Sequence, residues 1–428
     1  MLPLFIALSL QSAAIPTPPS SKTIVVIGQR IADAESDLKA CIARDCRTDE
    51  DIDATLRLAE TQLLAGKYRD ARKTLLASLS RNKEEARAYP IPVSDLYRAN
   101  GKVAAHLGFD RDYYNSTWGI YRTMKYGLPS DDHRRFSALM EVAEMMHRTR
   151  GHERARYYYD EVAEEARKAG RHDIAALAQL RSAIRHLPPG SSMQIYEIEK
   201  VASLQGEGMH APVLEAKVAL ARIAYSKGDE ATAQGFQREL AALDIKRPIL
   251  IFSPPYSMVQ RELHNGSDFN FPFAPTPAVN GDGSGAVSLG PGAGASAPSG
   301  GDPNGLQGSN RGSITSILAL SQWSQTKRMA GNFDDMWADI GFRITPEGKV
   351  ADVEIVRSKG DLDWAKPLLA SISLRRYTAG KADHPSSRVV ERYTYTSGYE
   401  GQTGTRTAQR SPKARVEYVD LSDLGAPE

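Results

Sequence analysis

The chain has 428 residues, 41% of them hydrophobic and 25% charged, a composition typical of soluble globular proteins with two or three domains. Its 54 basic and 52 acidic side chains leave a formal net charge of +2, so no strong field favours nucleic acid or an anionic membrane surface. No apolar run reaches the roughly 20 residues that a membrane-spanning helix needs. We therefore expect no nucleic-acid partner and no membrane span.

The N-terminus predicts export. An apolar run from Leu2 to Leu10 is followed by small residues, with Ser12 and Ala14 placed for cleavage by a signal peptidase. Residues 1–14 are predicted to be a signal peptide, and residues 15–30 an extended segment. No Lys or Arg precedes the run, so a disordered or misplaced start is the alternative.

The two cysteines of the chain lie in the stretch CIARDC, at Cys41 and Cys46. In an exported protein such a pair favours a disulfide. Residues five apart on a continuous helix lie about 8 to 9 Å apart at Cα, which is beyond disulfide reach, so the helix must end between them. Two thiolates without a nearby His fall short of a metal site. Two free thiols are the alternative.

Residues 31–245 are predicted to be helical, with apolar residues at helical spacing. The stretch from Ala59 to Leu75 resembles a tetratricopeptide repeat, with a turn glycine at Gly66 and a small packing residue at Ala71. Fainter copies surround Gly108, Gly151 and Gly228. The resemblance implies antiparallel helix pairs that stack into a curved solenoid with a concave binding face; an irregular bundle is the alternative.

Residues 246–330 are predicted to be a linker, because glycine, proline and serine dominate most of the segment. Its apolar beginning, Pro248 to Tyr256, is expected to cap the last helices as a strand or coil. The glycine-rich stretch GDGSGAVSLGPGAG lacks the Gly-Lys-Ser/Thr ending of a phosphate-binding loop. The linker predicts two separate domains joined by a tether.

The C-terminal part predicts a ββαβ domain over residues 331–400. Apolar residues alternate through 338–345 and again through 351–355, with Pro346 to Lys349 as the turn. A helix follows, with Leu368 and Ile372 on one face, and Ser387 to Ser397 reads as a third strand. In the tail, residues 401–428, the alternation at Arg415 to Leu421 predicts a fourth strand that could occupy the edge of the sheet.

This order resembles the C-terminal domain of the TonB family over residues 337–398. The matching residues are Phe342, Gly348, Val350, Val353, Ile355, Ser358, Gly360, Leu362 and the closing LRRY at Leu374 to Tyr377. The resemblance implies a sheet edge that accepts an extended peptide. The candidate partner-binding residues are Val389, Tyr393, Tyr395, Arg375, Arg376 and Tyr377.

Two departures weigh against energy transduction of the TonB type. The Tyr-Pro pair that usually precedes the first strand is replaced by SQWSQTKRMAGNFDDM, and no N-terminal membrane helix is present in this sequence. The stretch KTIVVIGQR, Lys22 to Arg30, resembles the short box by which outer-membrane transporters engage TonB domains, with a plain strand or disordered tail as the alternative.

No catalytic constellation is evident. His147 and His152 are five residues apart and do not share a helix face, and Ser324 to Lys327 matches a Ser-x-x-Lys motif without its companion motifs. The three tyrosines from Tyr157 to Tyr159 are interpreted as packing and solvated surface within a repeat. We expect no enzymatic activity, cofactor or metal.

The sequence therefore predicts an α+β multidomain protein: an all-α tetratricopeptide-like solenoid, a flexible Gly/Pro/Ser linker and a small ββαβ TonB-C-like domain. The expected function is a periplasmic, non-enzymatic protein of Gram-negative envelope interactions or transport, with envelope proteins as partners, TonB-dependent outer-membrane transporters among them. The alternative is a divergent TonB-type energy transducer for outer-membrane transport.

Overall fold

A computed structural model describes residues 21–243, 245, 247–254, 336–379, 387–401 and 408–421. The predicted signal peptide, the Ser-x-x-Lys match and most of the predicted linker lie outside these described residues. Within them, no helix is long and apolar enough to cross a membrane.

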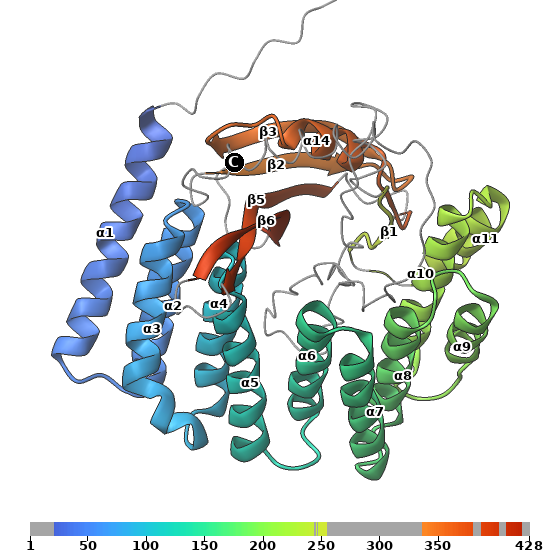
Figure 1. The fold of residues 1–428 in the computed structure, drawn as a ribbon, viewed down its shortest axis with the longest axis horizontal. Coiled ribbons are helices and arrows are strands. Elements are labelled where there is room, and N and C mark those ends of the chain that lie inside the picture. Colours follow the sequence, from blue (N-terminus) through green and yellow to red (C-terminus); the bar gives the residue numbers. More distant parts are fainter. Residues whose placement is uncertain are drawn as a thin grey trace, which may run out of the picture.

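Helices make up the N-terminal part and follow one another around an arc (Figure 1). Consecutive helices pack as antiparallel neighbours, as in tetratricopeptide-like repeats. The elements are α1 Ser21–Ala43, α2 Thr48–Leu64, α3 Tyr68–Asn82, the 3-10 helix η1 Lys83–Arg87, α4 Pro90–Leu107, α5 Asp110–Gly127, α6 His133–Arg150, α7 His152–Lys168, α8 His172–His186, α9 Ser192–Ala202, α10 His210–Ser226 and α11 Glu230–Ala241.

The repeat residues have the predicted roles. Gly66 and Gly108 follow α2 and α4 in the left-handed conformation, with φ of 72° and 76°, which ends each helix in a tight turn. Ala71 and Leu75 of α3 are fully buried against α2 and α4. Small residues at these positions let the helices approach closely, and successive helices bury apolar clusters between them.

The extended segment predicted for residues 15–30 is wrong where the structure describes it, because α1 already begins at Ser21. One face of the helix, with Ile31 and Leu38, packs on Ala54 and Leu58 of α2. The β-branched run at residues 23–27 favours a strand locally, and the helix of which it forms the first turns overrides that preference.

The C-terminal part is an antiparallel sheet with strand order β3-β2-β5-β6. Its elements are β2 Trp337–Ile344, β3 Val350–Lys359, α14 Ala365–Ser373, β4 Arg376–Tyr377, β5 Ser387–Gly401 and β6 Ala408–Asp420. One face of the sheet carries Ile340, Phe342 and Tyr393, which pack with Leu368 and Ile372 of α14. The stretch expected as an added strand lies in β6 and at Leu421 directly after it, and β6 pairs with β5 along most of its length.

The first residues of the predicted linker belong to the folded structure. Leu250–Phe252 form the strand β1, whose Ile251 is buried against Val218 and Leu240 at the last helices. This position agrees with the capping role expected for the segment. β1 also pairs antiparallel with β4, so Arg376 and Tyr377 form a strand rather than the end of a helix.

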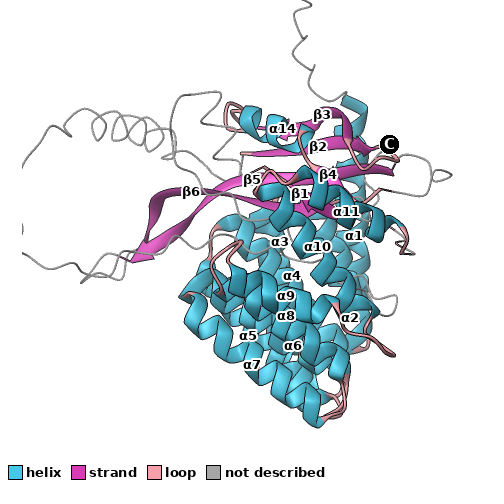
Figure 2. Ribbon diagram, turned by 90° about the vertical axis from the view of Figure 1, so that its right-hand side faces the viewer, coloured by secondary structure: helices cyan, strands magenta, loops and turns pink. Residues whose placement is uncertain are grey.

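The helical part and the sheet are in contact in the described residues. The sheet lies across the opening of the arc, and β5 and β6 reach the ends of the helices near α4 (Figures 1 and 2). Trp337 of β2 and Val419 of β6 share one apolar core with Leu63 and Leu107 of the helices. The sequence predicted two domains joined by a tether, and in the described residues the two parts share part of their apolar core.

Candidate functional site: the junction of helix turns and sheet

Arg392 of β5 anchors the sheet to the end of α2. Its guanidinium donates to the backbone carbonyls of Leu63 and Leu64 and pairs with Asp339 of β2. It also lies over the ring of Trp337 at 4.1 Å from the centroid. The last backbone carbonyls of a helix have no hydrogen-bond donors within the helix, and they form the negative end of the helix dipole. An arginine there donates hydrogen bonds to these carbonyls and places a positive charge at that end.

Thr394 connects β5 to two repeats at once. Its hydroxyl lies 2.8 Å from the hydroxyl of Tyr68 on α3 and 2.9 Å from Nδ1 of His106 on α4. The rings of Tyr68 and His106 stack with centroids 5.4 Å apart. Burial, followed by the positive charge of Arg392, lowers the pKa of His106 to about 3, so the imidazole is neutral at physiological pH.

A third set of polar contacts ties β6 to α5 and α6. Arg148 at the end of α6 pairs with Glu417 and lies over the ring of Tyr113, 4.8 Å from its centroid. Arg415 pairs with the same Glu417 at 2.8 Å and with Asp110 at the start of α5 at 2.6 Å. Because Arg148 and Glu417 are nearly fully buried, each requires the other's charge.

The turn glycines have a second role at this junction. A Cβ atom at Gly108 would lie 1.9 Å from the carbonyl oxygen of Ser397, and one at Gly66 would lie 2.4 Å from Nε1 of Trp337. No side chain larger than hydrogen fits at these distances. The glycines that end the first helix of a pair are thus also the points where the sheet rests on the repeats.

The candidate partner-binding residues do not lie on a free edge. β5 is paired on both sides, with β2 and with β6. Arg375, Tyr377 and Tyr393 are buried and form an internal network with Glu391, in which Arg375 pairs with the carboxylate at 2.8 Å. The other three, Val389, Tyr395 and Arg376, are only half-buried.

This correction has a physical reason. A ββαβ order leaves the third strand at the edge only when nothing follows it, and here the tail adds β6 along that strand. Tyr377 and Tyr393 therefore lie in the sheet's own core beside α14, and Val389 and Tyr395 pack against that core. The edges of the described sheet are β3 and β6.

The two cysteines lie where α1 ends. The helix stops at Ala43, Asp45 takes a positive φ of 55°, and the Cα atoms of Cys41 and Cys46 come within 5.2 Å of each other. This Cα separation lies within the range of a disulfide, and Cys41 and Cys46 are disulfide-bonded in the structure. Glu50 is the third potential metal ligand close by, but bridged sulfurs cannot act as thiolate ligands. The oxidation state in cells stays a prediction.

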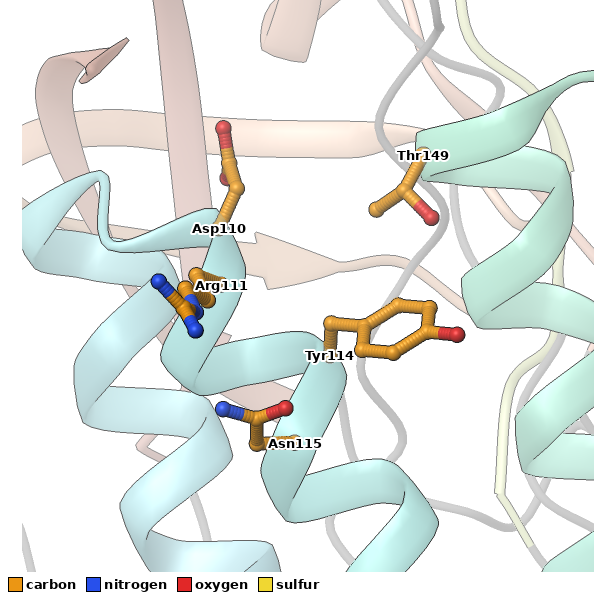
Figure 3. A pocket seen from close by; sticks show the side chains of 5 residues that line it. All are labelled: Asp110, Arg111, Tyr114, Asn115 and Thr149. Carbon is orange, nitrogen blue, oxygen red and sulfur yellow. The ribbon is translucent and has the colours of Figure 1, made fainter. Parts of the chain in front are cut away.

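A hollow of about 490 Å³ lies beside the junction, at the ends of α5 and α6. Its lining residues are Asp110, Arg111, Tyr114, Asn115 and Thr149. The ring of Tyr114 points from α5 towards Thr149 (Figure 3). The hollow opens next to the Arg415 contact of Asp110, so it adjoins the place where the sheet meets the repeats.

The residues that make the junction were missed by the sequence analysis. Arg392, Thr394 and Thr396 alternate with the tyrosines of β5, and such a polar set reads as a solvent-facing strand face. All three are completely buried. One feature of the sequence could have predicted them. The last backbone carbonyls of each helix have no hydrogen-bond donor within the helix, so they need donors from another element.

No protein-family model matches the chain, and no curated protein matches it. Solved structures of low similarity are repeat proteins. A kinesin light chain-like protein of Podosopora anserina with TPR-like repeats is 16% identical with a TM-score of 0.34, and the match covers 46% of this chain and 95% of that one. BtubC of P. vanneervenii is 14% identical with a TM-score of 0.38, over 60% of this chain and 99% of that one.

A third structure is the Rap conjugation gene regulator of plasmid pLS20 in complex with the Phr* peptide. It is 17% identical with a TM-score of 0.31, and the match covers 52% of this chain and 62% of that one. Likenesses at this level carry no argument about function. The tetratricopeptide-like architecture of the N-terminal part therefore rests on its own helix pairs, turn glycines and packing.

Proposed function

We propose that this chain is a non-enzymatic, periplasmic protein-binding protein that presents one open sheet edge from a helical-repeat scaffold. The observation that carries the proposal is the difference between the two edges of the sheet. At β6, the side chains of Arg415 and Glu417 pair with charged residues at the helix ends, and Leu421, directly after the strand, joins the apolar core there. β3 ends the sheet: it pairs with β2 on one side, and on its other side no described strand pairs with it. A single bridge joins Lys349, directly before β3, to Arg376.

An open edge presents backbone N–H and C=O groups that an extended segment of another protein can pair with. β3 is ten residues long, and its Asp352 and Glu354 side chains are 60% and 63% exposed. The junction between the sheet and the repeats supports this role. It orders the sheet before a partner binds, so binding costs less conformational entropy. Strand addition at β3 is therefore the binding mode that we assign to the chain.

The periplasmic location and the envelope partners, including TonB-dependent transporters, are inferred from the signal-like N-terminus and the TonB-like strand and helix order. The non-enzymatic character is supported by the contacts that the buried polar groups make within the protein. The buried imidazole of His106 stacks on Tyr68 and contacts Thr394, and Glu417 is held between two arginines. These groups serve the packing of sheet on repeats.

The test places a photoreactive amino acid at Glu354 of the full chain in cells, and the same residue at Asp53 as a control. Asp53 is 64% exposed on α2, far along the chain from the sheet. We expect defined adducts with envelope proteins from position 354, recovered from the periplasmic fraction, and none of these from position 53. Equal adducts at both positions, or a chain recovered from the cytosol, would overturn the proposal.

A further inference from the structure

The even-numbered helices of the repeats lie side by side, with α6 next to α8 and α8 next to α10. Ion pairs connect the helices of this layer in series, and each pair joins an arginine on one helix to a glutamate on a neighbouring one. We call this series the charge ladder. Its pairs are Arg98–Glu141 between α4 and α6, Glu144–Arg185 between α6 and α8, and Arg181–Glu215 between α8 and α10.

Arg222 of α10 continues the ladder, but it makes no ion pair with any described residue. It follows Glu215 by seven residues, so the two side chains lie on the same side of α10. α10 is the last even-numbered helix of the described repeats, and the strand β1 lies beside it at this end of the arc (Figure 1). Among the described residues, Arg222 is therefore an arginine of the ladder without a glutamate of its own.

One hydrogen bond positions the side chain of Arg222. Its Nη2 donates to the carbonyl oxygen of Leu250 in β1 at 2.7 Å. A guanidinium carries several further N–H donors in a planar fork. No nitrogen of Arg222 is both completely buried and unpaired, so these further donors are open to solvent although the side chain is half-buried. Arg222 can therefore bind a further acceptor while it keeps its contact with β1.

The charges around Arg222 leave its guanidinium without a close counter-charge. Burial, the largest effect, lowers the pKa of Arg222 to about 10, and Arg185 lowers it as well, whereas Glu215 and Tyr418 raise it. The guanidinium is therefore still charged at physiological pH. Glu215 does not pair with it, because both of its carboxylate oxygens accept hydrogen bonds from Arg181, at 3.0 and 3.2 Å. A partly buried cation of this kind gains more from an added carboxylate than an exposed arginine does.

The rest of the protein indicates which anion suits a buried guanidinium. A guanidinium can donate two parallel hydrogen bonds to one carboxylate, which fixes the direction of approach as well as the charge. Side-chain carboxylates are the partners of the buried arginines at the sheet, which are Arg148 with Glu417, Arg375 with Glu391, and Arg392 with Asp339.

An aromatic pair lies beside Arg222. Tyr225 follows it by three residues on α10, and so lies one turn away on the same side of the helix. The ring of Tyr225 meets that of Phe252 in β1 with centroids 5.6 Å apart, and both side chains are half-buried. The exposed parts of these rings offer apolar surface next to the guanidinium, which suits a segment of polypeptide better than a small inorganic anion.

We propose that Arg222 binds the side-chain carboxylate of an aspartate or glutamate in an extended segment of a partner protein, and that Tyr225 and Phe252 contact the atoms that flank this carboxylate. The partner then supplies the next glutamate or aspartate of the charge ladder. The site lies at α10 and β1 and uses a side chain, whereas strand addition at β3 uses backbone groups. The two binding modes can therefore fail independently.

The test uses the full chain and a rhodamine-labelled peptide of three Gly-Ser-Glu units with an amidated C-terminus. One matched peptide has glutamine in place of glutamate and is also amidated, and a second has glutamine and a free C-terminal carboxylate. Fluorescence polarisation should show binding of the glutamate peptide and at least about tenfold weaker binding of both glutamine peptides, which corresponds to about 1.4 kcal/mol.

Variants at two arginines locate the contact. Arg222→Gln should weaken binding of the glutamate peptide about fivefold or more. Arg238→Gln removes the same charge from an exposed position on α11 and should leave binding unchanged. Arg222→Glu should reverse the preference, so that a peptide of three Gly-Ser-Arg units binds more tightly than the glutamate peptide. Circular dichroism checks the fold of each variant, and Arg222→Lys, which keeps the charge, should still bind the glutamate peptide more tightly than the glutamine peptides.

Three results would overturn the proposal. Equal binding of the glutamate peptide and the amidated glutamine peptide would exclude recognition of a carboxylate. Equal weakening by Arg222→Gln and Arg238→Gln would indicate non-specific attraction between charges. Binding of the free-carboxylate peptide as tightly as the glutamate peptide would assign the site to a chain terminus. Adducts from position 354 should be the same in Arg222→Gln as in the wild type, so a failure here is distinguishable from a failure of strand addition at β3.

Discussion

Arg148 at the end of α6 and Glu417 on β6 form a buried ion pair, although they lie 269 positions apart in the chain. The pair joins the third helix pair of the described repeats to the last strand of the sheet. A buried charge that loses its partner is far more costly than a buried pair is favourable. The contact therefore makes the position of the sheet on the repeats specific.

The first prediction concerns this pair. Glu417→Gln leaves the guanidinium of Arg148 buried without its counter-charge, so we expect the free energy of unfolding to fall by about 3 kcal/mol. Urea denaturation followed by circular dichroism measures the change. Glu354→Gln is the control, because Glu354 is 63% exposed and contacts Arg388 at only 3.4 Å, and it should change the free energy by less than about 1 kcal/mol. Equal effects of the two changes would contradict the prediction.

Local patterns were sufficient for most of the elements. The glycine and alanine spacing around Gly66 and Ala71 predicted a helix pair, and the alternation about Pro346 predicted the hairpin that joins β2 and β3. These features depend on backbone conformation and on one buried face, and the types of neighbouring residues predict both. The helix at Ser21 is the exception, because residues 15–30 were predicted to be extended.

The docking of the sheet could not be predicted in the same way. Arg392 and Thr394 look like one solvated face of a strand, and Arg148 looks like the exposed end of a helix. Their burial depends on partners that lie between 269 and 329 positions away. A polar residue can be buried when an element distant in the sequence supplies a hydrogen-bond or ion-pair partner. The local periodicity of the sequence does not predict such a partner.

The second prediction tests the double role of the turn glycines. Alanine at Gly108 must adopt a left-handed conformation and also meets the carbonyl of Ser397, so the sheet has to move. Gly228 has nearly the same conformation, with φ of 72°, but nothing lies within 4 Å of a Cβ atom there. Gly228→Ala should cost about 1 kcal/mol from backbone strain alone, and Gly108→Ala clearly more.

Two measurements separate these contributions. Urea denaturation gives the free energy of unfolding for each variant, and hydrogen exchange reports whether the amides of β5 and β6 lose protection. We expect loss of protection in Gly108→Ala only. Identical behaviour of the two variants would show that the sheet does not rest on the turn at Gly108.

The third prediction concerns the association of the two parts. A protease site inserted between Gly300 and Gly301 divides the chain into a piece with the repeats and β1 and a piece with β2 to β6. Because β1 pairs with β4 and the helix ends bind Arg392, the two pieces should stay together after cleavage and elute as one species from gel filtration. In the Glu417→Gln variant they should separate at lower denaturant concentration. Immediate separation of the wild-type pieces would contradict the docked arrangement.

The last prediction follows from His106. Burial lowers its pKa from about 6.5 to about 3, so between these values the unfolded chain binds a proton that the folded chain does not. The free energy of unfolding therefore rises with pH through this window: the contribution is fully present above pH 6.5 and is lost as the pH falls towards 3. Denaturation midpoints of the wild type at pH 4.5 and pH 7 should differ for this reason. In His106→Phe, which retains a ring beside Tyr68, the difference should shrink, whereas His172→Gln, a change at an exposed histidine, should leave it as in the wild type. An undiminished pH dependence in His106→Phe would show that other groups, such as the carboxylates at the junction, determine the acid sensitivity.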